Sequence, residues 1–209
     1  MSDFFLATGN KHKIKEVLSL TPEINWKTIT DFPKLKKFSP KETGKTFAEN
    51  AEIKARAFAK KTGKITVAED SGLSVQALDG SPGVHSARWV KGSDSKRNTA
   101  LLKKLDGYNN KRAKYVATIC LYVPDIDEVS SIKGLKKDSV TFFSGEVHGF
   151  IAMEPKGDKG FGYDPIFIPN GYWFEGVVYT SFVLEDESRL DCKTSNANPP
   201  NPLYPSFFQ

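Results

Sequence analysis

The sequence contains few of the residues from which disulfide frameworks and zinc sites are built. Among its 209 residues are two cysteines, Cys120 in an apolar run and Cys192 in a polar segment, and three histidines. This cysteine pattern favours a reducing cytoplasm over a disulfide framework. His12, His85 and His148 have neither zinc-ligand spacing nor a cysteine cluster nearby, which argues against a zinc site.

A long apolar run is also lacking. The longest one, from Tyr115 to Val123, has the length of a strand and falls short of the roughly 20 residues that a membrane-spanning helix needs. The first residues, Met1 to Leu6, include neither a basic segment nor a long apolar one, so we expect no secretion signal and no membrane partner. Hydrophobic residues form 39% and charged residues 26% of the chain, which is typical of a globular protein.

The net charge of +5 invites a nucleic-acid interpretation, because basic proteins bind phosphate backbones through counterion release. The lysines are scattered along the whole chain, however, and no DNA- or RNA-binding motif accompanies them. An anionic substrate accounts for the charge equally well. We therefore expect no nucleic-acid partner.

Alternating strand and helix patterns predict an α/β fold with a mixed sheet. A short buried strand is expected at 4–8, and apolar residues at helical spacing predict a helix at 11–20. Thr46 and Glu49 form a capping box for a second helix, which Gly63 ends. We further expect strands at 65–68, 73–77, 114–123 and 138–151 (the last as one strand or a bulged pair), a sharp turn at 69–72, and a helix at 95–105.

The segment Thr8-Gly9-Asn10-Lys11-His12-Lys13 joins the first expected strand to the first expected helix. Unpaired backbone N–H groups and the helix dipole attract anions at such a position, and the Lys13 side chain reaches the same place. A plain strand–helix connection is the commoner explanation of a loop like this one. Lys54, four residues after Asn50 on the same helix face, is a second candidate phosphate ligand or else an exposed lysine.

The segment Ala68-Glu69-Asp70-Ser71-Gly72-Leu73 carries two adjacent carboxylates. In an extended strand adjacent side chains point to opposite faces, so one of the two faces a given site. Carboxylate oxygens are hard ligands that suit Mg²⁺, which takes one or two of them together with water and phosphate oxygens. A surface turn, stabilised by an aspartate bonded to its own backbone, is the alternative.

A glycine-rich loop with two aromatic residues follows near the end of the patterned part of the chain. It reads Gly160-Phe161-Gly162-Tyr163-Asp164-Pro165. Aromatic faces stack on nucleobases, and a carboxylate accepts hydrogen bonds from a base edge. A hairpin whose aromatics pack in the core is the alternative.

Residues 173–209 differ in composition from the rest. They hold five acidic residues against two basic ones, and four prolines lie within 199–205. This composition predicts a loop or a poorly ordered tail rather than a packed element. We therefore expect one domain over residues 1–172, followed by an atypical C-terminal tail at 173–209.

Five sequence blocks occur in order along the first part of the chain. They are Thr8-Gly9-Asn10-x-x-Lys13-x-x-Glu16; Thr43-Gly44-x-Thr46-Phe47-x-Glu49-Asn50-Ala51-x-x-Lys54-Ala55; Ala68-Glu69-Asp70-Ser71-Gly72-Leu73; Gly80-x-Pro82-Gly83-Val84-x-Ser86-Ala87-Arg88; and Gly160-Phe161-Gly162-Tyr163-Asp164-Pro165-x-Phe167. Together they resemble the inosine/xanthosine triphosphate pyrophosphatase family over roughly residues 4–172, and five ordered blocks make coincidence implausible.

The resemblance implies an elongated, two-lobed α/β fold around a mixed β-sheet, an active site in the cleft between the lobes, and a homodimer. It also implies Mg²⁺-dependent hydrolysis of deaminated purine nucleoside triphosphates (ITP, dITP and XTP) to monophosphate and pyrophosphate, which clears them from the nucleotide pool. Asp70 would be the catalytic carboxylate and a metal ligand, and Glu42 the second metal ligand. The substrate-binding residues would be Thr8, Gly9, Asn10, Lys11, His12, Lys13, Lys54, Ser71, Phe161, Gly162, Tyr163 and Asp164.

The chemistry suits these residue types. Attack of water on the α-phosphorus requires neutralised charge on both sides of the phosphate, which a metal ion and two lysines provide. A carboxylate beside Mg²⁺ stays ionised and orients or deprotonates the water. We therefore expect Lys13, Lys54 and Asp70 to share one ligand.

Two departures from the family pattern have consequences. Glu69 stands where the family more often has aspartate, which keeps the charge. The chain contains no Ser-His-Arg triplet, which in the family follows the nucleotide loop and reads the purine base. We therefore expect a frameshifted, truncated or replaced C-terminus, with reduced activity or relaxed base selectivity, because polar groups that the wrong base leaves unpaired provide that selectivity.

Three other interpretations remain open. The first is a related pyrophosphatase that acts on modified pyrimidine triphosphates. The second is a nucleotide-binding remnant without catalysis, and the third, ranked last, is a basic nucleic-acid-binding domain.

Overall fold

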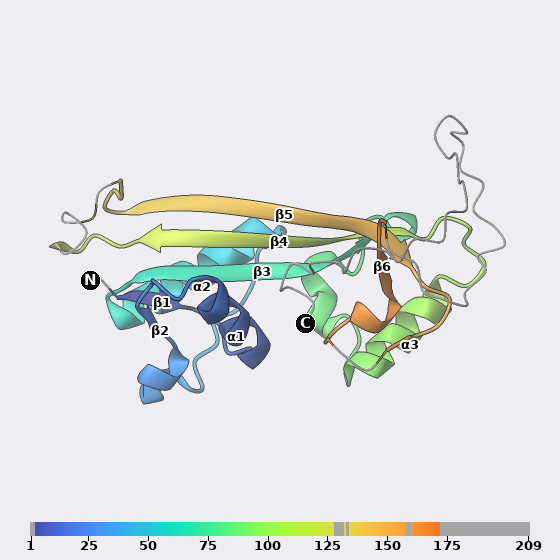
Figure 1. Ribbon diagram of the computed structural model, residues 1–209, viewed down its shortest axis with the longest axis horizontal. Coiled ribbons are helices and arrows are strands. Elements are labelled where there is room, and N and C mark those ends of the chain that lie inside the picture. Colours follow the sequence, from blue (N-terminus) through green and yellow to red (C-terminus); the bar gives the residue numbers. More distant parts are fainter. Residues whose placement is uncertain (1–2, 128–131, 133, 158–159, 172–209) are drawn as a thin grey trace, which may run out of the picture.

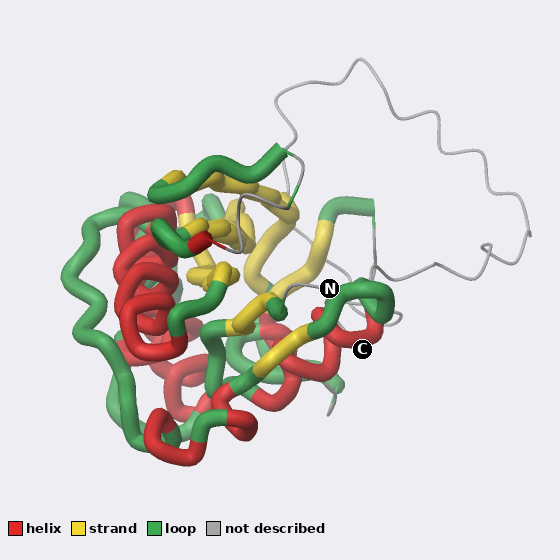
Figure 2. The backbone as a smooth tube through the Cα atoms, turned by 90° about the vertical axis from the view of Figure 1, so that its left-hand side faces the viewer, coloured by secondary structure: helices red, strands yellow, loops and turns green. Residues whose placement is uncertain are grey.

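The structure, a computed structural model, describes residues 3–127, 132, 134–157 and 160–171. Six strands form one mixed sheet in the order β2-β1-β3-β4-β5-β6, and helices flank the strands (Figure 2). The strands are β1 (Phe4–Leu6), β2 (Trp26–Lys27), β3 (Ile65–Val75), β4 (Arg112–Val123), β5 (Ser139–Ile151) and β6 (Phe167–Pro169), and the α-helices are α1 (Lys11–Leu20), α2 (Phe47–Thr62) and α3 (Asp94–Lys104). The α/β fold class predicted from the sequence is confirmed. The predicted tail at 173–209 lies outside the described residues.

The sheet is parallel on one side and antiparallel on the other. Strand β1 pairs in parallel with β2 and β3, whereas β3, β4, β5 and β6 pair in antiparallel fashion. Strands β3, β4 and β5 run along the length of the molecule (Figure 1). Within the described residues β1 pairs with β3 only from Ile65 to Val67. From Ala68 to Leu73, therefore, one edge of β3 has no neighbouring strand.

Local sequence signals determine where helix α2 begins and ends. The Thr46 hydroxyl accepts a hydrogen bond from the Glu49 N–H at 3.1 Å, and the Glu49 carboxylate accepts one from the Thr46 N–H, also at 3.1 Å. Gly63 ends the helix in the left-handed conformation, with φ of 66°. These contacts satisfy backbone groups that the helix ends leave unpaired. The predicted capping box and stop are confirmed.

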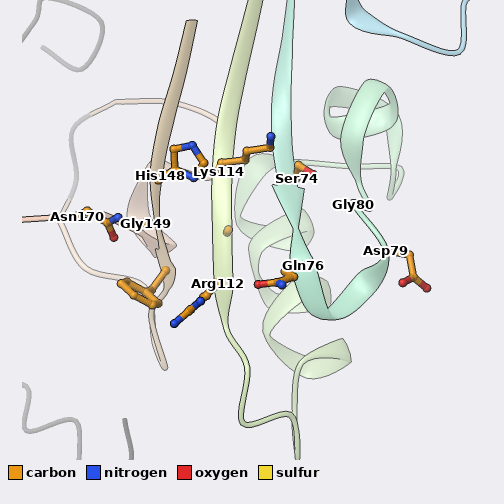
Figure 3. Close-up of a pocket in the computed structure, with 11 residues that line it drawn as sticks. Ser74, Gln76, Asp79, Gly80, Arg112, Lys114, His148, Gly149 and Asn170 are labelled. Atoms are coloured by element: carbon orange, nitrogen blue, oxygen red, sulfur yellow. The ribbon is translucent and has the colours of Figure 1, made fainter. Parts of the chain in front are cut away.

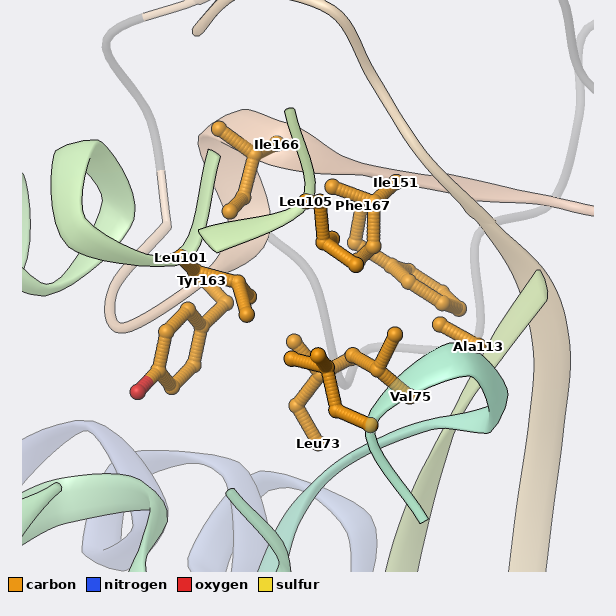
Figure 4. Packing of buried hydrophobic residues seen from close by; sticks show 10 residues of the cluster. Leu73, Val75, Leu101, Leu105, Ala113, Ile151, Tyr163, Ile166 and Phe167 are labelled. Carbon is orange, nitrogen blue, oxygen red and sulfur yellow. The ribbon is translucent and has the colours of Figure 1, made fainter. Parts of the chain in front are cut away.

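The hydrophobic core is distributed along β3 in separate clusters. Two of them lie against the first half of the strand, one around Phe5, Phe58 and Ala68 and another around Ile65 and Val123. A third lies against its second half and consists of Leu73, Val75, Leu78, Leu101, Leu105, Ala113, Ile151, Tyr163, Ile166 and Phe167 (Figure 4). We call the two ends the N-terminal lobe (β1, β2, α1, α2) and the C-terminal lobe (α3, β6 and the 160–166 loop), which lie apart along the molecule in Figure 1.

The predicted turn at 69–72 is wrong, because β3 is continuous from Ile65 to Val75. Gly72 lies in the middle of this strand. A Cβ atom there would collide with the Ser86 hydroxyl and the Gly83 carbonyl oxygen, which belong to the 3-10 segment Gly83–Arg88. The glycine thus permits a close packing contact and does not reverse the chain.

The remaining predicted elements agree with the structure within a few residues. The helix predicted at 95–105 is α3, and the segment at 138–151 is the single strand β5. Among the described residues, none of the helices combines the length and the apolar character of a membrane-spanning segment.

Candidate active site

Five polar side chains form a network around Asp70, on the side of β3 that α2 covers. The Lys54 ammonium lies 2.7 Å from Asp70 Oδ1 and 2.9 Å from Glu42 Oε1. The second Asp70 oxygen accepts a hydrogen bond from Asn50 Nδ2 at 3.3 Å, and Arg88 lies 2.8 Å from Glu42 Oε2. We call these residues the Asp70 cluster. Positive and negative groups alternate in it, so each buried charge has a partner.

Burial and neighbouring charges shift the pKa values within the Asp70 cluster in different directions. Burial raises the pKa of Asp70, although Lys54 and Asn50 act against this rise. Burial has the same effect on Glu42, but Lys54 and Arg88 outweigh it and hold the pKa of Glu42 below its ordinary value. Burial alone would lower the pKa of Lys54, and the two carboxylates raise it instead. Lys54 is therefore charged at neutral pH.

The loop before α2 positions Glu42 through Gly44. The Gly44 N–H donates to Asn50 Oδ1 at 2.8 Å, so Asn50 contacts both this loop and Asp70. A Cβ atom at Gly44 would lie 2.6 Å from the Glu49 Cβ and 2.7 Å from Asn50 Oδ1, which is too close for any residue larger than glycine. The second sequence block therefore has a structural purpose: its glycine brings the loop that carries Glu42 against the helix.

A second polar group lies on the opposite side of β3. The Lys13 ammonium, from α1, contacts the Glu69 carboxylate and lies 3.1 Å from the Ser71 hydroxyl. We call Lys13, Glu69 and Ser71 the Glu69 cluster. Glu16, one turn further along α1, faces Lys13 and Glu69, and burial raises its pKa.

The structure thus brings Lys54 and Asp70 together and places Lys13 in a separate cluster. Glu69 and Asp70 are consecutive, and their Cα atoms are about 3.8 Å apart across a trans peptide. Their side chains project to opposite faces because strand residues alternate. Both clusters therefore flank the same short stretch of β3, at the edge that β1 leaves open.

The loop after β1 reaches this same edge. The Ala7 N–H donates to the Val67 carbonyl oxygen at 2.8 Å, after which the chain turns away into α1. Asn10 caps the helix by accepting from the His12 N–H at 2.9 Å, and the Thr8 hydroxyl accepts from the Asn10 N–H at 3.1 Å. Ligands of α/β proteins commonly bind at the carboxyl end of a parallel strand, next to a helix N-terminus, and this position has that geometry.

The loop at 160–164 approaches from the C-terminal lobe. The Phe161 and His12 rings stack with centroids 5.6 Å apart and an interplanar angle of 23°. The Gly162 N–H donates to Asp94 Oδ2 at 2.8 Å, which fixes the loop to the start of α3. The contact between His12 and Phe161 thus joins the two lobes.

The two remaining polar side chains of this loop hold it in place. Asp164 accepts from the Phe161 N–H at 2.8 Å and from the Tyr115 hydroxyl at 3.1 Å, and burial raises its pKa. Tyr163 is only 3% exposed, packs in the core of the C-terminal lobe (Figure 4) and donates its hydroxyl to the Ser86 carbonyl oxygen at 3.0 Å. Burial raises the pKa of Tyr163 to about 12. The aromatic packing that the sequence left as an alternative therefore applies to Tyr163.

A sequence profile described as the Ham1 family matches residues 4–181. The chain belongs to the Ham1 family. The match begins at the first strand and includes all five blocks that we identified in the sequence.

Several relatives of this Ham1-family chain carry names that state an activity. The dITP/XTP pyrophosphatase of Deinococcus deserti is 40% identical over 167 residues, covering 79% of this chain and 73% of that protein. The dITP/XTP pyrophosphatase of Symbiobacterium thermophilum is 44% identical over 187 residues, covering 88% and 86%. A crystal structure of a nucleoside-triphosphatase / dITP/XTP pyrophosphatase from Mycobacterium abscessus superposes with a TM-score of 0.67 at 35% identity, covering 81% of this chain and 85% of that one.

The Asp70 cluster is the part of this Ham1-family chain that fits a divalent cation. Among the described residues, no three His, Cys, Asp or Glu side chains gather in the way that an all-protein metal cage requires. Mg²⁺ does not require such a cage, because it usually takes one or two carboxylates together with water and substrate phosphates. Glu42 and Asp70 provide two carboxylate oxygens on either side of Lys54. The donor set fits Mg²⁺ held jointly with a phosphorylated substrate.

A separate hollow of this Ham1-family chain lies where the C-terminal ends of β3 and β5 meet the N-terminal end of β4 (Figure 3). It has a volume of about 650 Å³. Its lining residues are Ser74, Gln76, Asp79, Gly80, Arg112, Ala113, Lys114, His148, Gly149, Phe150 and Asn170. None of the residues predicted for the site lines this hollow.

Three residues of the site were missed in the sequence analysis. Asn50 and Arg88 belong to the Asp70 cluster, and Glu16 faces the Glu69 cluster. All three lie inside the sequence blocks that carry the family resemblance, and their position in these blocks was the signal by which they could have been predicted.

Proposed function

We propose that the protein hydrolyses deaminated purine nucleoside triphosphates, such as dITP, XTP and ITP, to the monophosphate and pyrophosphate with Mg²⁺ as cofactor. The observation that carries this proposal is the Asp70 cluster beside the open edge of β3, in a chain about 40% identical to proteins named dITP/XTP pyrophosphatases. Clearing these nucleotides from the pool is the corresponding cellular role.

In this proposal the polyphosphate lies along the open edge of β3. Lys54 reaches it from one side of the strand and Lys13 from the other, and the loop Thr8-Gly9-Asn10 places the N-terminal end of α1 at the same edge. Lys11 and Ser71 border the same position. Two ammonium groups on opposite sides neutralise the charge on adjacent phosphates.

Asp70 orients the attacking water and takes its proton. A bond forms between the water oxygen and the α-phosphorus, and the bond from this phosphorus to the bridging oxygen breaks. Pyrophosphate departs with the electron pair. The raised pKa of Asp70 favours this role, since a base with a higher pKa accepts a proton more readily. Mg²⁺ held by Glu42 and Asp70 would add positive charge at the phosphates.

In this proposal the purine base of the nucleotide binds at the 160–164 loop. Phe161 presents an aromatic face and already stacks on His12, so a purine ring has a platform between the lobes. Gly162 gives the loop its backbone conformation with φ of 63°, while Tyr163 and Asp164 position it. Because the chain contains no Ser-His-Arg triplet, we infer weaker discrimination between 6-oxo and 6-amino purines, or reduced turnover.

The proposal extends to the context of the enzyme. Residues 1–172 form the pyrophosphatase domain, and the enzyme acts as a homodimer in the cytoplasm without nucleic-acid or membrane partners. The exposed apolar side chains Phe142, Phe143 and Val147 of β5 support a protein interface. Cys120 is buried as a free thiol with its pKa raised by burial to about 12, which suits a reducing compartment.

The test is pyrophosphate release from dITP, XTP, ITP, dUTP and ATP, each with and without Mg²⁺. We expect release from the first three substrates, dependence on Mg²⁺, and loss of activity in Asp70→Asn. A preference for dUTP would favour the pyrimidine alternative. Thermal stabilisation by ITP and Mg²⁺ without any pyrophosphate release would show a nucleotide-binding remnant, and the proposed activity would then be wrong.

A further inference from the structure

Lys54 lies between the same two carboxylates that are assigned to the cation. Its ammonium is 2.9 Å from Glu42 Oε1 and 2.7 Å from Asp70 Oδ1, and the side chains of all three residues are less than a quarter exposed. We propose that the Lys54 ammonium and the divalent cation compete for these two oxygens, so that binding of the cation releases Lys54 toward the polyphosphate. This inference rests on the proposed function and adds the order in which the site is assembled.

The other oxygens of the two carboxylates are already engaged. Asp70 Oδ2 accepts from Asn50 at 3.3 Å, and Glu42 Oε2 pairs with Arg88 at 2.8 Å. The oxygens that remain to bridge the carboxylates are those on either side of the Lys54 ammonium. A cation that binds both carboxylates therefore takes the position of that ammonium.

Charge and geometry permit this exchange. A divalent ion carries twice the charge of an ammonium, so it gains more from two carboxylates in a partly buried site. Lys54 has a flexible four-carbon stem that allows its charged end to move while its base stays on α2. A released ammonium that found no anion would be costly at this depth.

That cost creates a thermodynamic link between the cation and the nucleotide. Once the cation displaces Lys54, a phosphate at the open edge of β3 provides the ammonium with a new partner. Each ligand therefore tightens the binding of the other, and the coupling is reciprocal. Replacing Lys54 removes the competitor and the phosphate ligand together, so it should tighten the cation and weaken the nucleotide.

The structure offers a graded set of variants for the test. Lys54→Met removes a charge that touches both carboxylates, whereas Arg88→Met removes one that touches only Glu42. Lys60→Met removes an equal charge from the exposed side of α2, away from the cluster. If these residues acted on the cation only through their charge, the effect of each variant on cation affinity would depend on its distance from the site alone. Competition additionally requires that the removed ammonium contact both carboxylate oxygens.

The experiment titrates Mn²⁺ at pH 8 and follows the free ion by electron paramagnetic resonance. We expect Lys54→Met to increase the affinity for Mn²⁺ by about tenfold or more and Arg88→Met to increase it by less. Lys60→Met should leave the affinity unchanged, since a unit charge at contact distance outweighs remote ones. Calorimetry at saturating Mg²⁺ with the α,β-imido analogue of ITP, which resists cleavage at the α-phosphorus, should show the opposite change in nucleotide affinity. Lys54→Met should bind this analogue about tenfold more weakly than the wild type does. Lys54→Gln, which keeps a polar end, should give the same signs and serves if Lys54→Met does not fold.

Failure of this inference is distinguishable from failure of the proposed function. If the wild-type protein binds no Mn²⁺, or if Asp70→Asn binds it as well as the wild type does, the metal assignment itself is wrong. If the wild type binds Mn²⁺ and Asp70→Asn does not, but removal of Lys54 leaves the affinity unchanged or weakens it, the competition is overturned while the metal site stands.

Discussion

Asp70 and its neighbour Glu69 carry the same charge but lie in different surroundings. Asp70 is 9% exposed and contacts Lys54 and Asn50, which both belong to α2. Glu69 faces the other side and contacts Lys13 from α1. The alternation of side chains along one strand thus gives a ligand at its edge two unlike acidic environments, one buried within a network and one more open to solvent.

The sharpest test of this difference is the removal of each negative charge in turn. Asp70→Asn should lower kcat by about a thousandfold or more, because the variant lacks both the proton acceptor and one cation ligand. Glu69→Gln should cost less than about a hundredfold, since Glu69 orients Lys13 and does not touch the attacking water. Steady-state pyrophosphate release measures both. Equal losses in the two variants would remove the distinction between the clusters.

Lys13 provides the next largest effect, on the Glu69 side. Lys13→Met should raise KM for ITP by about tenfold to a hundredfold with a smaller change in kcat, because a charged hydrogen bond to phosphate contributes about 1.5–3 kcal/mol. Lys15→Met, an exposed lysine on the same helix, is the matched control. A kcat loss as large as that of Asp70→Asn would instead assign Lys13 to the chemical step.

Gly72 tests the packing that supports the Asp70 side. Gly72→Ala should destabilise the fold by about 1–3 kcal/mol, since its methyl group would collide with Ser86 and with the Gly83 carbonyl oxygen. Urea unfolding measures this change. Gly145→Ala on β5 is the control, because a Cβ atom there meets no heavy atom within 4 Å. If both variants were equally stable, the close contact at Gly72 would have no energetic weight.

The smallest predicted effect separates two carboxylates within the Asp70 cluster. The pKa of Glu42 is lowered in the folded state. The ionised Glu42 side chain therefore stabilises the fold at pH values above the ordinary pKa of a glutamate, and this stabilisation is lost as the pH falls through the lowered pKa. The pKa of Asp70 is raised, so its contribution has the opposite dependence and is lost as the pH rises.

Thermal unfolding between pH 3.5 and 7 checks this opposition. From acid toward neutrality, the Tm of the wild type should rise relative to that of Glu42→Gln and should fall relative to that of Asp70→Asn. Parallel slopes for the two variants would contradict the assigned directions.

The sequence predicted most reliably the features that depend on neighbouring residues. Thr46 and Gly63 bound helix α2 through contacts within four residues, and such local signals can be read from the sequence. The turn expected at 69–72 was wrong because Gly72 accommodates Ser86, a contact that no local pattern reveals. Strands β2 and β6 have only two and three residues, too few to show a period.

The candidate site could be predicted in part for the same reason. Asp70, Lys54 and Glu42 were singled out by family resemblance, and the structure places them in contact. The Arg88–Glu42 pair joins residues 46 positions apart, which residue types alone do not predict. Tyr163 reads as a ligand-contacting aromatic in sequence, yet its side chain fills the core, because a glycine-rich loop leaves the direction of its aromatics undetermined.

The unbroken pairing of β3 with β4 has a mechanical consequence. The two strands remain hydrogen-bonded through ten consecutive residue pairs, from Thr66 to Val75, and this ladder passes beneath both lobes. This continuous ladder connects the N-terminal half of β3 to its C-terminal half without a break. A substitution that breaks this pairing would therefore disturb the Asp70 and Glu69 sides of the strand together, because both clusters are built on the same stretch of β3.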